Sequence, residues 1–149
     1  MAFEITTPIG WATLDANGHM ANTSYLDVAV DCRMSYFESM GFGPAEMAKQ
    51  GIGPVVRKDE VEYFRELRLL QTARVTLQLA GISADGSRFR LVNEVFRPDG
   101  VLAARILTTG GWFDLKARAL VAPPAALYDA LSALSRTEEF EILPSSLKA

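Results

Sequence analysis

Hydrophobic and polar positions divide the chain into a helical part and an extended part. From Thr23 to about Met40, apolar side chains leave few polar positions, which is typical of a helix that is buried on most of its surface. Two glycines follow, and glycine is favoured just beyond a helix end. Pro44 then begins a predicted short second helix that continues to Lys49.

Beyond the second helix, polar and apolar residues alternate with the two-residue period of a strand that has one buried face. The alternation predicts strands over residues 55–67, 73–82, 88–97 and 101–115, with turns at Asp85-Gly86 and at Pro98-Asp99-Gly100. Gly110-Gly111 predicts a bulge or bend in the last of these strands. A further strand, interrupted by Pro8, is predicted for residues 3–13. A helix is predicted over residues 125–134, and the polar tail from Ser135 is expected to fray.

The order of these elements predicts an α+β fold in a single domain spanning residues 1–149. A strand and a buried helix come first, and four consecutive antiparallel strands and a terminal helix follow. Because a long helix that is apolar nearly all round must be covered, we expect a five-stranded antiparallel sheet wrapped around it. The chain length is that of one ordinary domain.

Composition narrows the classes of function. Hydrophobic residues make up 49% of the chain and charged residues 22%, which favours a packed core over disorder. The net charge of −3 argues against nucleic acid as the main partner. No apolar run is long enough to cross a membrane, and the N-terminus lacks the pattern of a secretory signal, so we expect a cytoplasmic location without membrane attachment.

Metal and cysteine chemistry are not expected. The one cysteine, Cys32, excludes an intramolecular disulfide and lies among apolar residues, where a cysteine behaves as a small hydrophobic side chain. The one histidine and the scattered carboxylates show no spacing typical of metal ligands.

The segment Asp15–Asn22 is polar, contains the only histidine of the chain and leads directly into the long helix. Each of its residues has a structural interpretation: Asp15 could accept hydrogen bonds in an Asx-turn, His19 could shape the loop, and Asn22 could cap the helix. Gly18 is expected to supply a backbone conformation that other residues disfavour. Alternatively, the carboxylate and the unpaired N–H groups of the helix start could act together on a substrate.

Two other positions are candidates with open alternatives. Tyr25 could belong to the core or to a pocket wall. Asn93 interrupts an apolar row, so its amide needs a hydrogen-bond partner or faces an acyl pocket. A basic run could bind phosphates or form a solvated strand face; it consists of Arg57, Lys58, Arg65 and Arg68.

The run Asp15-Ala-Asn-Gly18-His19-Met-Ala-Asn22-Thr-Ser-Tyr25-Leu resembles the signature of hotdog-fold thioesterases of the 4-hydroxybenzoyl-CoA thioesterase-like group. The resemblance extends over nearly the whole chain. The segment 97–103 is similar to the family's turn before its last long strand, and residues 114–118 are similar to the end of that strand. The chain departs from the family at Ala21, where many members have Asn, and at residues 71–73, where a Gly-Asp turn is common.

The resemblance implies a hotdog fold and hydrolysis of an acyl-CoA or acyl-carrier thioester without a cofactor. It implies that Asp15 acts as general base or nucleophile and that the backbone N–H of Asn22 stabilises the oxyanion, with His19 as a third catalytic candidate. Gly18, Tyr25 and Asn93 are the corresponding substrate-binding candidates. It also implies a homodimer or a dimer of dimers, with active sites between subunits.

Two rival functions use the same sequence features. One is an enoyl hydratase or dehydratase on the same fold, which would also use an Asp and a His. The other is a non-catalytic protein that binds acyl groups without turning them over.

Overall fold

The computed structural model describes residues 2–147, which form one mixed α+β unit. Its helices are α1 (Ser24–Ser39), α2 (Pro44–Gln50) and α3 (Ala125–Ser132), and a single 3-10 turn spans Trp11–Thr13. The strands are β1 (Phe3–Pro8), β2 (Ile52–Tyr63), β3 (Thr72–Ser83), β4 (Arg88–Phe96), β5 (Leu102–Asp114), β6 (Ala119–Val121) and β7 (Arg136–Leu143).

The described strands form one sheet that is five positions wide, in the order β1-β3-β4-β5-β2. The short strand β6 pairs with the end of β5 beyond β4, and β7 pairs with the end of β3 beyond β1, so neither widens the sheet. All neighbouring pairs are antiparallel except β3 with β7. The predicted α+β class, with an antiparallel sheet and a central helix, is therefore confirmed.

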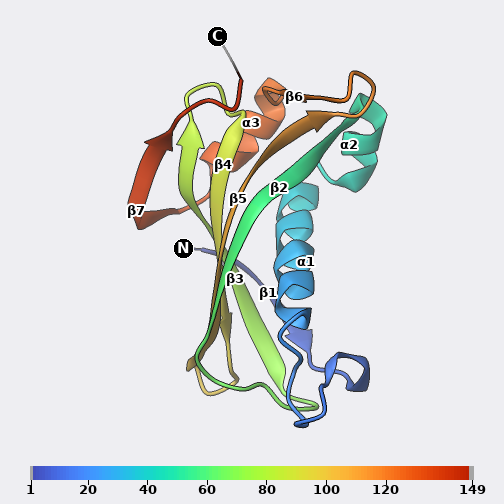
Figure 1. Cartoon of the computed structure of the whole chain (residues 1–149), viewed down its shortest axis with the longest axis vertical. Helices are drawn as coiled ribbons and strands as arrows, with labels where there is room; N and C mark the ends of the chain where they lie inside the picture. The colour runs from blue at the N-terminus through green and yellow to red at the C-terminus, as the bar shows by residue number, and fades with distance from the viewer. Residues whose placement is uncertain (1, 148–149) are drawn as a thin grey trace.

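Helix α1 lies lengthwise along one face of the sheet (Figure 1). Its buried side chains recur at three- and four-residue intervals and form one face of the helix. They include Tyr25, Val28, Ala29, Cys32, Tyr36 and Phe37. The opposite face carries exposed residues, among them Val30, so the expectation that the helix is buried nearly all round is wrong. The predicted bounds of 23–40 agree with the observed helix to within one residue at each end.

Aromatic rings fill the core between the far half of α1 and the sheet. The ring of Phe37 meets Trp112 edge-on with centroids 5.8 Å apart, and Trp112 lies 5.3 Å from Phe89. The Tyr36 hydroxyl donates a 2.5 Å hydrogen bond to the carbonyl of Ala130, which attaches α3 to α1. This packing holds the helix at a fixed position on the sheet.

Three expectations about the strands need correction. The strand predicted for residues 3–13 ends at Pro8, and Trp11–Thr13 form a 3-10 turn. The tail from Ser135 does not fray, because residues 136–143 form β7 and pair in parallel with β3. The irregularity predicted at Gly110-Gly111 lies on the neighbouring strand: the register of β2 shifts between Val56 and Lys58, next to Gly110. A Cβ on Gly110 would lie 2.4 Å from the Val55 carbonyl oxygen, so this position requires glycine.

The end of the molecule at the start of α1 brings together two loops that are distant in sequence (Figure 1). The loop before α1 is attached to the connection between β2 and β3 by a 2.7 Å hydrogen bond from the N–H of Met20 to the carbonyl of Leu67. His19 and Arg68 form an isolated bridge beside it. In the described part of the chain, no helix is both long and apolar enough to cross a membrane.

Candidate active site

The loop before α1 is a miniature hairpin. Leu14 pairs with Met20, and the N–H of Asp15 donates to the carbonyl of His19 at 2.8 Å. A turn closes the hairpin, with the Gly18 N–H donating to the carbonyl of Asp15 at 3.1 Å. Gly18 has φ of +76° and open space around its Cα, so glycine is present here for its backbone conformation rather than for a close approach.

The Asp15 side chain shapes this hairpin with one of its two oxygens. Its Oδ1 accepts the N–H of Asn17 at 2.8 Å and the N–H of His19 at 3.3 Å, which is an Asx-turn. Within residues 2–147, Oδ2 accepts no hydrogen bond. The structural interpretation of Asp15 is therefore correct, and it leaves one carboxylate oxygen free for chemistry.

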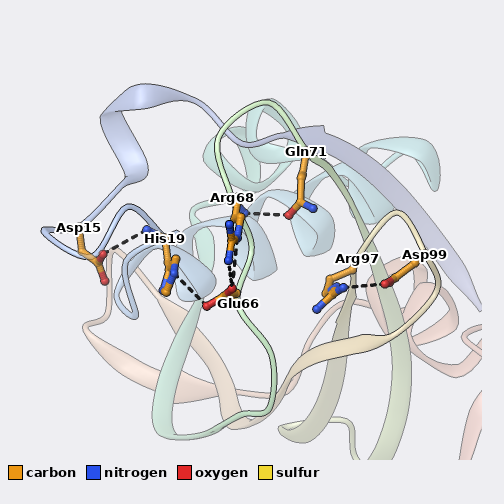
Figure 2. Close-up of polar contacts among 7 residues, drawn as sticks. All are labelled: Asp15, His19, Glu66, Arg68, Gln71, Arg97 and Asp99. Carbon is orange, nitrogen blue, oxygen red and sulfur yellow. Dashed lines mark hydrogen bonds and ion pairs between the residues drawn. The ribbon is translucent and has the colours of Figure 1, made fainter.

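The His19 ring points toward an acid from the connection between β2 and β3 (Figure 2). Its Nε2 lies 2.9 Å from Oε2 of Glu66. The other oxygen of Glu66 accepts hydrogen bonds from Arg68, and the Arg68 N–H donates to the Gln71 side chain at 2.8 Å. The hydrogen bond from Arg68 holds the pKa of Glu66 below its usual value. Glu66 thus remains ionised and fixes the orientation of the imidazole.

The first turn of α1 presents unpaired donors. Thr23 is the N-cap, and no side chain caps the helix, so the expectation that Asn22 caps it is wrong. Among the described residues, no carbonyl accepts the N–H of Asn22 or of Thr23, whereas the N–H of Ser24 donates to Ala21. Tyr63 at the end of β2 donates its hydroxyl to the Asn22 carbonyl at 3.0 Å, which orients the peptide between Asn22 and Thr23.

These groups surround a depression of about 310 Å³ at the start of α1. Its lining consists of Asp15, His19, Met20, Asn22, Tyr25, Tyr63, Phe64, Arg65 and Glu66. Tyr25 packs edge-on against Tyr63 with ring centroids 5.3 Å apart. Burial, with Tyr63 and Asp15 nearby, raises the pKa of Tyr25, so its hydroxyl stays neutral.

The structure places Asn93 apart from this depression. Asn93 is fully buried on β4, where its Oδ1 accepts a 3.0 Å hydrogen bond from Nε of Arg33 and its Nδ2 donates to the Thr76 carbonyl at 3.0 Å. The Asn93 amide thus has hydrogen-bond partners, which is one of the two alternatives predicted from the sequence. Asn93 does not line the depression with the loop residues. In the basic run, Arg65 lines the depression and Arg68 is paired with Glu66.

Glu66, Tyr63 and Arg33 were not recognised from the sequence. Glu66 and Tyr63 lie more than 40 residues from the loop that they contact, and each resembles an ordinary surface strand residue in the sequence. Arg33 is 6% exposed although it is an arginine. No local sequence pattern identifies any of these three residues. The pairing of β2 with β5 and the packing of α1 on the sheet bring them to their places in the fold.

Comparison with known proteins assigns the chain to a family. Residues 9–131 match the model of the thioesterase-like superfamily, and the chain belongs to that superfamily. Its sheet and central helix are those of the hotdog fold. No curated protein sequence matches the chain.

Solved structures with the same fold include thioesterases. The protein SAV2348 from Staphylococcus aureus, in complex with CoA, is 19% identical with a TM-score of 0.81, covering 100% of this chain and 90% of its own. Slr0204 from Synechocystis, a 1,4-dihydroxy-2-naphthoyl-CoA thioesterase, is 18% identical with a TM-score of 0.79, covering 90% and 98%. The probable thioesterase YbaW from Escherichia coli is 24% identical with a TM-score of 0.74, covering 89% and 98%.

Proposed function

We propose that the protein hydrolyses an acyl-CoA or acyl-carrier thioester, with Asp15 as the reactive group. The observation that carries this proposal is the depression that Asp15, with its free Oδ2, and Asn22, with its unpaired N–H, line together. A base or nucleophile and an oxyanion site are the two requirements of thioester hydrolysis. Membership of the thioesterase-like superfamily supports the same reaction.

Two reaction courses fit the carboxylate. As a general base, Asp15 takes a proton from water, the water oxygen bonds to the thioester carbon, and the carbonyl oxygen becomes an oxyanion. As a nucleophile, Asp15 attacks that carbon directly and forms an anhydride that water later cleaves. In both, the oxyanion accepts the N–H of Asn22, and collapse breaks the carbon–sulfur bond to release the thiolate, which takes up a proton. One such donor is worth about 3 to 4 kcal/mol of barrier.

The remaining lining residues have supporting roles in this proposal. His19 is held by Glu66 through Nε2, and it steers Asp15 or, where Nδ1 also carries a proton, donates from Nδ1 toward the substrate carbonyl. Tyr25 and Gly18 shape the wall and the turn of the binding site. Arg65 lies at the same depression, where a cation could bind a CoA phosphate.

The proposal includes a homodimer. Strand β2 ends the sheet order, so its outer edge carries backbone groups available for pairing with a second copy. Exposed apolar side chains follow the same edge, namely Val56, Tyr63 and Phe64. A partner joined along β2 would cover them and would approach the depression, whose lining includes Tyr63 and Phe64.

Release of free thiol from a panel of acyl-CoA substrates tests the function. We expect wild-type turnover, and we expect Asp15→Asn to lower kcat by on the order of 10²-fold or more, because asparagine neither accepts the proton nor attacks the carbonyl. Asparagine still accepts the N–H groups of Asn17 and His19, so the fold is retained. Circular dichroism and thermal melting verify that point.

Asp31→Asn is the matched control, since Asp31 lies on the exposed side of α1. It should keep the wild-type rate. Wild-type rates in Asp15→Asn would refute the assignment of Asp15, and loss of enoyl absorbance without thiol release would replace the proposed reaction by hydration.

A further inference from the structure

A second hollow lies farther along α1, between the helix and the edge of the sheet. It is an apolar groove of about 230 Å³ lined by Val30, Arg33, Met34, Phe37, Pro54, Val56, Phe89 and Leu91. Gly110 stands between Phe89 and Val56 in the sheet register, so no side chain of β5 separates them on the floor of the groove. A cavity of about 150 Å³ lined by apolar groups can hold a benzene molecule, so this groove has room for a medium-sized acyl group.

Arg33 is the only charged residue in this lining. Its Nε donates to Asn93 Oδ1 at 3.0 Å and its Nη2 donates to the Thr108 hydroxyl at 2.6 Å. Thr108 in turn donates to Oδ1 of Asp59 at 2.5 Å. The guanidinium is therefore held against the sheet at a fixed position, and the Thr108 hydroxyl links it to the Asp59 carboxylate.

Arg33 nevertheless keeps unused donors. A guanidinium has five N–H donors, and the described chain provides acceptors for only two of them. None of the ion pairs within residues 2–147 involves Arg33. Within residues 2–147 its Nη1 has no hydrogen-bond partner and is not fully enclosed, and the groove is the hollow that Arg33 lines.

Donors left unpaired on a mostly buried cation are costly, and a carboxylate or hydroxyl oxygen at the groove would satisfy them. We propose that the groove receives the far part of the acyl chain and that Arg33 binds an oxygen carried there, so that the enzyme prefers acyl groups with an ω-carboxylate or ω-hydroxyl over plain alkyl chains. This inference rests on the proposed thioesterase function and names its substrate class.

The position of Arg33 relative to the depression sets the length of the chain. Tyr25, at the depression, and Arg33 are eight residues apart on α1, which is a rise of about 12 Å. Both residues line hollows beside the same helix, and the proposal takes the acyl group to run along α1 from the first hollow to the second. Short acyl groups would stop before Arg33, and medium-length chains would reach it.

Thiol release from three CoA thioesters of equal chain length tests the proposal: octanoyl-CoA, ω-hydroxyoctanoyl-CoA and suberoyl-CoA, which ends in a carboxylate. We expect kcat/KM to rise in that order, with suberoyl-CoA favoured on the order of tenfold over octanoyl-CoA, because a planar guanidinium matches a carboxylate best. Equal or better hydrolysis of octanoyl-CoA by the wild-type protein would overturn the proposal.

Arg33→Met keeps most of the side-chain volume and removes the donors. It should abolish or reverse the preference for suberoyl-CoA over octanoyl-CoA, because methionine offers no N–H donor to the ω-oxygen. Met34→Leu, a change in the same lining without loss of a donor, should retain the wild-type order. An Arg33→Met protein that folds and keeps the full preference would contradict the role of Arg33. If Arg33→Met does not fold, Arg33→Lys should keep only a reduced preference.

Binding measurements test the role of Arg33 separately from the proposed hydrolysis. Calorimetric titration of Asp15→Asn with octanoyl-CoA and suberoyl-CoA compares affinities without turnover. Tighter binding of suberoyl-CoA supports the role of Arg33 even if the wild-type protein hydrolyses none of the three thioesters, which would refute only the hydrolytic function. Equal affinities together with normal hydrolysis would refute only the role of Arg33.

Discussion

Asp15 shapes its own loop with one oxygen and leaves the other free, so its structural role is compatible with the proposed chemical role. The same division occurs at Asn22, whose carbonyl is held by Tyr63 while its N–H stays unpaired. At the scale of the residue, the candidate site is therefore preorganised, because contacts within the protein rather than the substrate fix the position of these groups. Preorganised donors are the ones that stabilise a developing charge most effectively.

Glu66 provides a prediction at this scale. Glu66→Ala removes the acceptor that orients His19, and we expect kcat/KM for thioester hydrolysis to fall about threefold to tenfold, the range of one hydrogen bond. Because His19 is the only histidine, the ¹⁵N spectrum of its ring reports directly which nitrogen carries the proton. The variant should lose the preference for a proton on Nε2.

Glu62→Ala is the control for this experiment, since Glu62 is an exposed acid on β2 that does not line the depression. It should leave the rate and the spectrum unchanged. If Glu66→Ala changes neither, Glu66 is a surface ion-pair residue without influence on His19.

At the scale of the element, the C-terminal strand β7 is held by a cluster of hydroxyls around Asp85. The carboxylate accepts hydrogen bonds from Ser83, Ser87 and Ser145, which connects the turn between β3 and β4 to the segment after β7. Although burial acts in the opposite direction, these hydrogen bonds from Ser145, Ser87 and Ser83 lower the pKa of Asp85. Asp85 thus stabilises an end of the sheet distant from the candidate site.

Asp85→Asn should destabilise the protein at neutral pH by roughly 1 to 2 kcal/mol, because the amide cannot replace all of the charge-assisted hydrogen bonds. A carboxyl with a lowered pKa in the folded state contributes stability above its unfolded pKa, usually 3.8, and this contribution is lost as pH falls further. Urea unfolding of both proteins from pH 7 to pH 3 should therefore show a difference that shrinks below about pH 4. A difference that does not change with pH would contradict the role of the charge.

Gly110 gives a second prediction for the strands. A methyl group there meets the Val55 carbonyl oxygen at 2.4 Å and the Phe89 ring at 3.0 Å, and a backbone atom cannot move aside cheaply. We expect Gly110→Ala to cost about 1 to 3 kcal/mol in the free energy of unfolding. Gly10→Ala, where nothing lies within 4 Å, should stay within roughly 0.5 kcal/mol of wild type. Equal stabilities of the two variants would show that β2 can shift to accommodate the methyl group.

The elements that could be predicted from the sequence are those whose signals lie within the element itself or in the adjacent turns. Helix α1 and the strands β3, β4 and β5 were predicted because period and turn residues are local signals. The loop residues Asp15, His19, Asn22 and Tyr25 were predicted to lie together because they are close in sequence, and they line one depression. Strand β7 was missed because its order depends on pairing with β3, more than 50 residues away. Arg33 and Glu66 were not recognised from the sequence for the same reason.

At the scale of the whole molecule, strand β2 and its end contribute residues to both hollows. Tyr63 and Phe64 line the depression, and Pro54 and Val56 line the groove, so β2 or its end borders both. Val56 is 52% exposed despite its apolar side chain. A second copy paired along β2 would therefore bury apolar surface and enclose both hollows, which would exclude water from the proposed reaction.

Val56→Asp tests this arrangement, because it places a charge in the middle of the proposed dimer interface while the side chain remains exposed in the single chain. We expect sedimentation velocity to show a dimer or a larger even assembly for the wild-type protein and a shift toward monomer for the variant, with a parallel loss of thioester hydrolysis. Ile142→Asp is the matched control, since Ile142 is 67% exposed on β7, at the other side of the sheet. It should keep both the assembly and the rate of the wild type. A wild-type protein that is monomeric and fully active would show that one chain alone completes the site, and the depression at the start of α1 would then have to bind the substrate without a contribution from a partner.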